Sequence, residues 1–310
     1  MSLIKKLKKI SCLEIIMFVL LVSLFIVFIL KKNKEGFIEE KADFIRYTDN
    51  DIYDNFYSNV YDKILFNDAK NNFELDYILK NKNENKNENE NRLVLDIGCG
   101  TGHHVKLLSD HKIKAIGVDN SKSMIKKCRS KYPNLKFGEA DVLNGMEFPE
   151  STFSDILCLY FTIYYFKNKR QFLENCFKWL KPNGVLILHL VDVNNFDPVV
   201  PNATFFDKNS KRPTKSEIEF DKFDYKANFK QDKDIDFDKA NLTNPNVIFR
   251  EVFKFNDKNK ARVNEHKLYM SSQQSILGAA KEVGFILKSH VEMKEIQYDY
   301  NYLYTLQKPM

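Results

Sequence analysis

The sequence predicts an α/β fold built on a mostly parallel sheet, and three observations predict it. An apolar run, Leu93–Ile97, is followed at once by the turn Gly98-Cys99-Gly100-Thr101-Gly102 and then by a helical pattern from His103. A second strand, Lys114–Asp119, ends in an acid. Beyond it, apolar strand-like runs alternate with amphipathic helical runs, as in strands joined by crossover helices. The 310 residues, 44% of them hydrophobic, suffice for a large core.

The glycine turn indicates a ligand site at the end of the first strand. Glycine has no Cβ, so the backbone can pass close to a ligand, and the free N–H groups of the following helix point at it. A dinucleotide-binding loop requires the spacing G-x-G-x-x-G. Here the third glycine comes one residue early, and Asp96 stands two residues before the first. This spacing argues against a nicotinamide oxidoreductase.

The remaining elements continue the alternation. Further strands are predicted at residues 135–137, 156–160 and 185–191, with a helix at 170–180 between the last two. Residues 192–270 form an insertion with a charged middle and a predicted antiparallel pair, Val247–Phe255 with 261–270. A helix at 271–283 stops at Gly284, and a hairpin of 285–291 with 300–306 ends the chain. Residues 42–79 are predicted to be helical, and 80–92 to be a polar loop.

The N-terminal region predicts a membrane anchor. Residues 15–30 are apolar and uncharged, and lysines flank them on both sides. A cleaved signal peptide is the rival interpretation, but lysines stand where a small-residue cleavage site would be needed. We therefore expect a single-pass membrane protein with its catalytic domain in the cytosol. The expected organisation is an anchor at 1–34, a helical segment and loop at 35–91, and a catalytic domain at 92–310.

Charge and cysteine content exclude several classes of function. The net charge of +6 arises within residues 1–34, which hold seven lysines and one glutamate, so the rest of the chain is neutral. No nucleic-acid partner is expected. The five cysteines are odd in number and lack C-x-x-C spacing, which favours reduced, buried thiols over a zinc site or disulfide framework. We expect His266 to be a surface or packing residue rather than a base.

Three segments together resemble a known family. They are D-x-G-x-G-x-G at 96–102, Gly-Val-Asp-Asn-Ser-x-x-Met at 117–124 and Leu-Lys-Pro-Asn-Gly-Val-Leu at 180–186. They resemble class I S-adenosylmethionine-dependent methyltransferases, most firmly over residues 92–191. The resemblance implies a Rossmann-like sheet of seven strands, with helices on both faces and a reversed final strand. S-adenosyl-L-methionine is then the expected cofactor.

The resemblance also implies which residues bind the cofactor. Asp119 and Asn120 follow the second strand, where a carboxylate accepts hydrogen bonds from ribose hydroxyls. The acid at the end of the third strand, Asp141, with Val142 beside it, is expected at the adenine. Residues 53–62 resemble an aromatic lid helix that closes over donor and acceptor. The expected cofactor-binding residues are Asp96, Gly98, Gly100, Gly102, Asp119, Asn120, Asp141, Val142, Tyr160 and Tyr57.

The segment after the fourth strand bears on the methyl acceptor. Residues 161–163 and 195–198 look most like amino-sugar N-methyltransferases, in which a histidine often stands where this chain has Tyr165. Tyr164 and Tyr165 are each either core residues or residues that orient the acceptor. A tyrosine is a poor general base at neutral pH, so we expect a small-molecule acceptor that is methylated on nitrogen rather than oxygen. The alternative is a non-catalytic adenosylmethionine-binding scaffold at a membrane.

Overall fold

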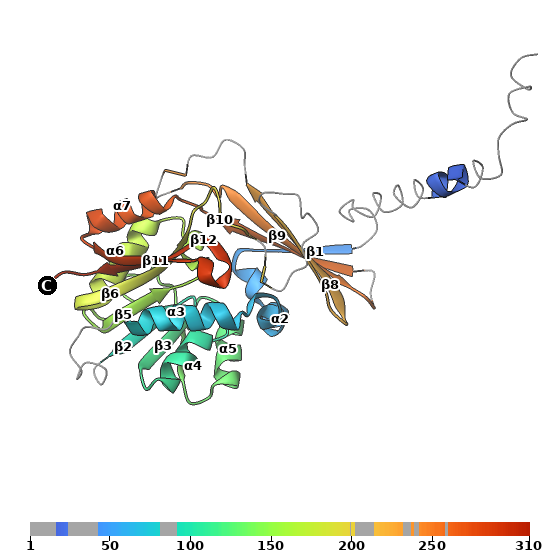
Figure 1. The fold of residues 1–310 in the computed structure, drawn as a ribbon. Coiled ribbons are helices and arrows are strands. Elements are labelled where there is room, and N and C mark those ends of the chain that lie inside the picture. The colour runs from blue at the N-terminus through green and yellow to red at the C-terminus, as the bar shows by residue number, and fades with distance from the viewer. Residues whose placement is uncertain are drawn as a thin grey trace, which may run out of the picture. The chain divides into compact units, whose positions relative to one another are not determined.

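The computed structural model describes residues 17–23, 43–80, 92–198, 200–201, 214–231, 237–238, 242–257 and 260–310. The chain divides into a short unit, residues 1–44, and a large one, residues 45–310. The seven-stranded sheet described below belongs to the large unit (Figure 1). The residues that line the cavity described below belong to the same unit. The polar loop at 80–92, apart from its two ends, and both N-x-[ST] asparagines, Asn202 and Asn241, lie outside the described residues.

The prediction of a single-pass membrane protein is wrong on this structure. Among the described residues, no helix is long and apolar enough to cross a membrane. The described helix in the predicted anchor covers residues 17–23, and the rest of 15–30 lies outside the described residues.

The larger sheet has seven strands. Its spatial order is β11 (Ile286–Met293), β12 (Tyr298–Gln307), β6 (Leu180–Val191), β5 (Phe153–Cys158), β2 (Leu93–Ile97), β3 (Lys114–Asp119) and β4 (Lys136–Glu139). The five strands from β6 to β4 pair in parallel, whereas β12 is antiparallel to both β6 and β11. This confirms the predicted Rossmann-like sheet, its reversed final strand and the C-terminal hairpin.

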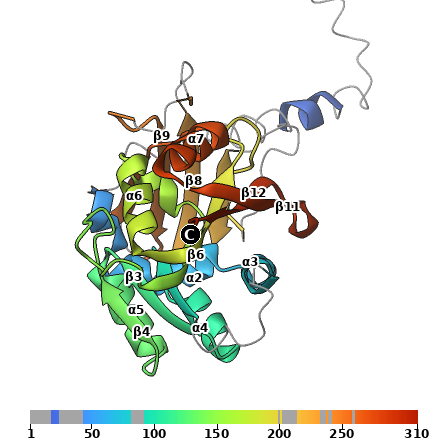
Figure 2. The ribbon, with the colours of Figure 1, turned by 90° about the vertical axis from the view of Figure 1, so that its left-hand side faces the viewer.

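Helices cover both faces of this sheet (Figures 1 and 2). Alternate strand residues point to opposite faces. On one face, Leu95 and Leu186 pack in the same core cluster as residues of α6 (Lys169–Trp179) and α7 (Gln273–Val283). On the other face, α3 (Asp68–Lys80) and α4 (His103–Asp110) pack against residues such as Val94. Helix α5 (Lys122–Lys131) continues that second layer against β3 and β4.

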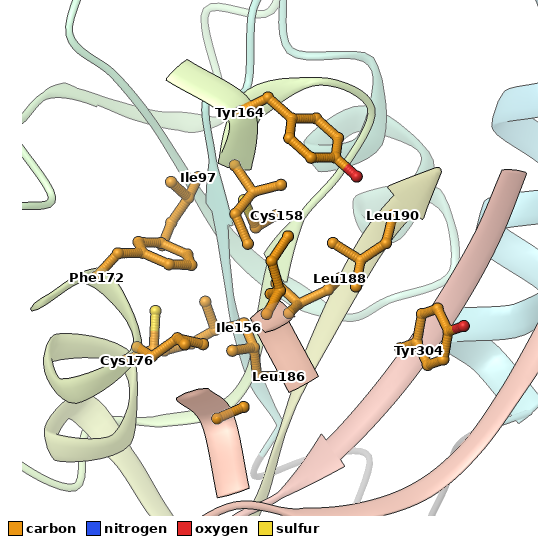
Figure 3. Packing of buried hydrophobic residues seen from close by; sticks show 14 of the residues in the cluster. Ile97, Ile156, Cys158, Tyr164, Phe172, Cys176, Leu186, Leu188, Leu190 and Tyr304 are labelled. Carbon is orange, nitrogen blue, oxygen red and sulfur yellow. The ribbon is translucent and has the colours of Figure 1, made fainter. Parts of the chain in front are cut away.

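Tyr164 belongs to the core beneath α6 (Figure 3). It lies in η4 (Thr162–Tyr165), the short 3-10 helix after β5, and its side chain is fully buried. The Tyr164 hydroxyl accepts a hydrogen bond of 2.9 Å from the backbone N–H of Val191. Of the two interpretations of Tyr164, the core residue is favoured over the residue that orients the acceptor, because its hydroxyl is engaged inside the core and its side chain is not part of the lining of the cavity described below.

A second, antiparallel sheet makes the predicted strand count only partly right. Its order is β1 (Asp43–Thr48), β10 (Lys260–Leu268), β9 (Val247–Phe255), β8 (Phe223–Gln231) and β7 (Lys215–Glu219). The predicted pairing of 247–255 with 261–270 is confirmed, with Glu251 opposite Asn264. Strands β7 and β8 were not predicted, although Phe223, Tyr225, Ala227 and Phe229 alternate with polar residues along β8 as in a half-buried strand.

The stretch 42–79 is only partly the helical segment that was predicted. Residues 43–48 form a strand because they pair with the edge of β10, a partner more than 200 residues away in the chain. Helix α2 (Asn55–Leu65) begins after η2 (Asp49–Tyr53), where the Asp54 carboxylate accepts a 2.9 Å hydrogen bond from the N–H of Tyr57. Helices α2 and α3 then fill the remainder of the stretch.

Candidate active site

A cavity of about 530 Å³ lies where the carboxyl ends of β2, β3 and β5 meet the antiparallel sheet. The parallel strands contribute the residues just after Ile97, Val118 and Leu159, and β10 contributes residues 266–268. Helix α2 adds a side formed by tyrosines. Ligands bind at the carboxyl ends of strands in open α/β sheets, and typical ligand cavities measure about 300–1,000 Å³. The position and size of this cavity mark it as the candidate active site.

The glycine turn has a conformation that requires glycine. Gly98 and Gly100 have φ values of 67° and 54°, and both line the cavity. A Cβ on Gly98 would lie 2.6 Å from Cγ2 of Thr162, so no side chain fits there. The N–H groups of Gly98 and Cys99 donate to the carbonyl of Val118, at 2.8 and 3.0 Å. These bonds fix the turn against β3, with its backbone facing the cavity.

Gly102 does not line the cavity, contrary to the prediction that it binds the cofactor. It precedes α4 at φ 84°, and a Cβ there would lie 2.8 Å from the ring of Phe137. A glycine is therefore required at position 102 by the backbone conformation and by packing against β4. The spacing of glycines in the sequence does not distinguish a glycine needed for packing from a glycine that contacts a ligand.

Asp119 ends β3 and is held by two backbone donors. Its carboxylate accepts hydrogen bonds from the N–H groups of Gly100, at 3.1 Å, and Ser121, at 2.9 Å. Burial raises the pKa of Asp119 to about 6, even though both N–H groups favour the charged form. Each carboxylate oxygen accepts one of these bonds and has further capacity, so it can accept a hydroxyl hydrogen bond from a ligand in the cavity.

Asp96 presents an unpartnered oxygen. It is buried near the end of β2 and lines the cavity, and its Oδ2 atom has no hydrogen-bond partner among the described residues. Burial raises the pKa of Asp96 to about 6, and the carboxylates of Glu74 and Asp119 add to that rise. A buried acceptor without a donor is costly to the folded protein. A cationic donor bound in the cavity would remove that cost.

Three other predicted residues line the cavity beside Asp119 and Asp96: Asn120, Asp141 and Val142. Tyr160 also lines it and has a φ of 52°, which is uncommon for a residue with a side chain. Such strained positions are concentrated at functional sites. Nζ of Lys70 lies 5.2 Å from the centre of the Tyr160 ring, close enough for a cation–π contact.

Aromatic rings from several helices and strands also line the cavity. Tyr53 of η2 lies in edge contact with Tyr57 of α2, at 5.5 Å, and with Tyr165 of η4, at 6.2 Å. The hydroxyl of Tyr57 donates to Glu251 Oε1 at 3.0 Å, so this predicted cofactor-binding residue offers the cavity its ring rather than its hydroxyl. Tyr61 stands over the glycine turn, 3.4 Å from where a Cβ of Gly100 would lie.

Residues 94–184 match the family described as "Methyltransferase domain". The chain carries a methyltransferase domain. The matched stretch contains the glycine turn and Asp119, and S-adenosylmethionine is the cofactor of this enzyme domain. A probable S-adenosylmethionine-dependent methyltransferase of Mycolicibacterium smegmatis is 27% identical over 107 residues, which are 34% of this chain and 41% of that protein. A trans-aconitate 2-methyltransferase of Variovorax paradoxus is 28% identical over 101 residues, 32% of this chain and 38% of that protein.

Solved structures share the fold over more of the chain. The CcbJ methyltransferase of Streptomyces caelestis superposes with a TM-score of 0.63 at 15% identity, over 84% of this chain and 100% of that one. An S-adenosylmethionine-dependent methyltransferase of Clostridium acetobutylicum superposes with a TM-score of 0.58 at 16% identity, over 83% of this chain and 99% of that one. By contrast, this chain spans about two fifths of the length of the curated relatives that it matches.

The methyltransferase domain fits its cofactor at the atoms described above. S-adenosylmethionine carries an amino group, a sulfonium and two ribose hydroxyls, all of which suit carboxylate acceptors or negative surroundings. Asp96 has an oxygen without a donor, and Asp119 stands where the ribose is held in related folds. Among the described residues, no cluster of histidine, cysteine and acidic side chains is suited to a metal ion.

Sequence reasoning missed two residues of the domain's site, Glu251 and His266. Of the two expectations for His266, a surface or a packing residue, the structure rules out the first, because His266 is buried, and it also lines the cavity. Glu251 of β9 is fully buried behind it, with their side chains in contact. Their strands carry polar residues on both faces, so alternation alone does not distinguish these two from solvent-exposed neighbours. The signal that would have found them is a pairing between strands, which one sequence does not contain.

Proposed function

We propose that this protein transfers a methyl group from S-adenosylmethionine to nitrogen of a small-molecule amine. The observation that carries the proposal is the shared cavity, which the glycine turn and its acids line together with the rings of Tyr53 and Tyr165. The glycine turn and the acids suit the cofactor, and the two rings suit an acceptor. The cofactor supplies an electrophilic methyl group on a sulfonium, and the protein's task is alignment and exclusion of water.

We assign the cofactor's contacts to residues that line the cavity. Asp119 accepts the ribose hydroxyls, with Asn120 beside it, and Asp96 Oδ2 accepts the amino group of the methionine part. Asp141 and Val142 flank the adenine. Gly98 and Gly100 let the backbone approach, and Tyr160 and Tyr57 contribute ring surface. In support, Asp96 Oδ2 is unpartnered and the Asp119 carboxylate retains capacity to accept hydrogen bonds.

The charge and the rings of the cavity favour a cationic acceptor. The charged side chains that line it, apart from histidines, are Asp49, Asp62, Asp96, Asp119, Asp141, Lys70, Lys167 and Lys267. Lys267 is paired with Asp49, Lys70 with the buried Glu74 and Asp62 with Lys131. Asp96, Asp119 and Asp141 then stand against Lys167 alone, so acids are in excess in the cavity. Aromatic rings add cation–π attraction for an ammonium group. A carboxylate acceptor would meet repulsion from these acids.

The test is methyl transfer by the full chain with radiolabelled S-adenosylmethionine. The acceptor panel contains primary and secondary amines including amino sugars, matched alcohols and phenols, and carboxylic acids including trans-aconitate, which some curated relatives carry in their names. We expect label in amines and none in alcohols or acids. Label confined to hydroxyl or carboxyl compounds would overturn the nitrogen assignment. A folded protein that binds no S-adenosylmethionine by titration calorimetry would overturn the function itself.

A further inference from the structure

A chain of hydrogen bonds leads from the aromatic side of the cavity into the protein. The Tyr53 hydroxyl donates to the Tyr165 hydroxyl at 2.9 Å. The Tyr165 hydroxyl lies 2.8 Å from Nδ1 of His266, and Nε2 of His266 lies 2.7 Å from Oε2 of Glu251. These four residues come from η2, η4, β10 and β9, so the chain exists only in the folded protein.

Glu251 is held as a buried carboxylate. Besides His266, it accepts hydrogen bonds from the hydroxyls of Tyr57, at 3.0 Å, and Tyr225, at 2.8 Å, and from Nδ2 of Asn264, at 2.9 Å. Burial by itself would raise the pKa of Glu251, yet its pKa lies below the ordinary value, first because of attraction to a charged His266 and then because of the hydrogen bonds from His266, Asn264 and Tyr225. An ionised carboxylate can only accept hydrogen bonds.

The direction of each hydrogen bond follows from that carboxylate. Since Glu251 accepts, Nε2 of His266 must carry hydrogen, and a neutral His266 therefore presents the lone pair of Nδ1 to Tyr165. Tyr165 donates its own hydrogen to Nδ1 and accepts one from Tyr53. The Tyr165 oxygen retains one lone pair, and its side chain lines the cavity and is half-buried.

We propose that Tyr165 and His266 form a proton relay that takes one proton from the bound methyl acceptor, with Glu251 stabilising the cation that results. The acceptor's N–H donates to the free lone pair of Tyr165. Its N–H bond breaks as a new O–H bond forms on Tyr165, while the original Tyr165 O–H breaks and Nδ1–H forms on His266. The nitrogen keeps its electron pair, and His266 becomes an imidazolium beside Glu251.

This inference rests on the proposed function and specifies its acceptor further. It departs from the expectation from the sequence that Tyr165 takes no part in base catalysis, because His266 stands 2.8 Å behind the Tyr165 hydroxyl. An ammonium N–H is a far stronger acid than an alcohol O–H, so a neutral imidazole can take its proton. Burial raises the pKa of the Tyr165 hydroxyl well above its usual value, which disfavours a free phenolate and requires both protons to move together. The acceptor is therefore an amine that enters the cavity protonated, where the acids attract it, and reacts after losing one proton.

The relay is distinguishable from a set of structural hydrogen bonds. His266 is faced by Tyr53 from η2, Tyr57 from α2, Tyr165 from η4 and Glu251 from β9. His266→Gln keeps an N–H group for Glu251 but cannot accept a proton from Tyr165. Tyr165→Phe removes only the hydroxyl. Tyr164→Phe is the matched control, because it makes the same change one residue earlier at a side chain that does not line the cavity.

The experiment measures kcat against pH for an amine that the wild-type protein methylates, together with S-adenosylmethionine affinity. We expect His266→Gln and Tyr165→Phe to bind the cofactor normally and to lose about 10²–10⁴-fold in kcat, the usual contribution of a general base. Their kcat should rise tenfold per pH unit up to the pKa of the bound amine, because only amine that has already lost its proton reacts. The wild type and Tyr164→Phe should share a flatter profile.

Each outcome decides a separate question. Unchanged kcat and an unchanged pH profile in both His266→Gln and Tyr165→Phe would overturn the relay and leave the methyltransferase function intact. If His266→Gln does not fold, Tyr165→Phe decides alone, since it loses a single hydroxyl from a half-buried side chain. A wild-type protein that binds S-adenosylmethionine but methylates no amine would overturn the proposed function, and the relay with it.

Discussion

The guanidinium of Arg92 binds both carboxylate oxygens of Asp155. Nε donates to Oδ2 at 2.8 Å and Nη2 to Oδ1 at 2.5 Å, and both side chains are less than one tenth exposed. Nη2 also donates to the carbonyl of Ile78 at 3.0 Å. Arg92 immediately precedes β2, so it joins the start of that strand to β5 and to α3. The pair therefore fixes the strands whose far ends carry the glycine turn and Tyr160.

We predict that Asp155→Asn destabilises the protein by about 3–5 kcal/mol, because it leaves the buried Arg92 without its counter-charge. The measurement is urea unfolding at neutral pH. Asp110→Asn is the control, since Asp110 pairs with Lys106 on the exposed surface of α4. That change should stay within about 0.5 kcal/mol. Equal effects of the two substitutions would contradict the role given to the Arg92 pair.

Asp119→Ala should weaken binding of S-adenosylmethionine by on the order of 1–3 kcal/mol, the range for hydrogen bonds to a charged group. Titration calorimetry of the variant and of the wild type measures this loss of affinity. The stability of the fold is monitored at the same time, because Asp119 also accepts from Gly100 and Ser121. Wild-type affinity in a folded Asp119→Ala protein would show that the ribose is bound elsewhere.

Asp96→Asn should stabilise the cofactor-free protein and weaken cofactor binding. Burial raises the pKa of Asp96 to about 6 in the folded protein. An acid whose folded pKa is raised contributes stability below its unfolded pKa of about 4, and that contribution is lost as pH rises to about 6. At pH 7 the ionised Asp96 therefore costs about 3 kcal/mol, which a neutral isostere removes. Thermal unfolding with and without S-adenosylmethionine measures both effects, and lower stability of the free variant would refute the prediction.

Two glycine-to-alanine changes should shift the free energy of unfolding in opposite directions. Gly98→Ala places a Cβ 2.6 Å from Thr162 at a φ of 67°, so we expect a loss of more than about 1–2 kcal/mol and weaker cofactor binding. Gly278 lies inside α7 with nothing within 4 Å of an added Cβ. Gly278→Ala should therefore stabilise by about 0.5–1 kcal/mol. Thermal unfolding of both variants provides the comparison, and a neutral Gly98→Ala would contradict the steric argument.

The sequence by itself determined the parallel half of the fold and most of the cavity lining that surrounds the glycine turn. Leu93–Ile97 and Lys114–Asp119 were predicted with the bounds that the structure has, because each is a buried apolar run ended by a turn or an acid. Asp96, Gly98, Gly100 and Asp119 follow from the same local pattern, since a strand, its turn and the next helix are adjacent in the chain. The spacing of residues along the chain is therefore enough to predict these positions.

Only the tertiary structure decided the acceptor side. Tyr53, Tyr165, Glu251 and His266 lie on four elements, and their hydrogen bonds span as many as 112 residues. Tyr164 and Tyr165 are neighbours of the same type, yet one hydroxyl is bound in the core and the other faces the cavity. Such differences depend on strand pairing and packing between distant segments, for which a single sequence has no periodic or local signal. The glycine turn is a property of consecutive residues, whereas the proton relay is a property of contacts that folding creates.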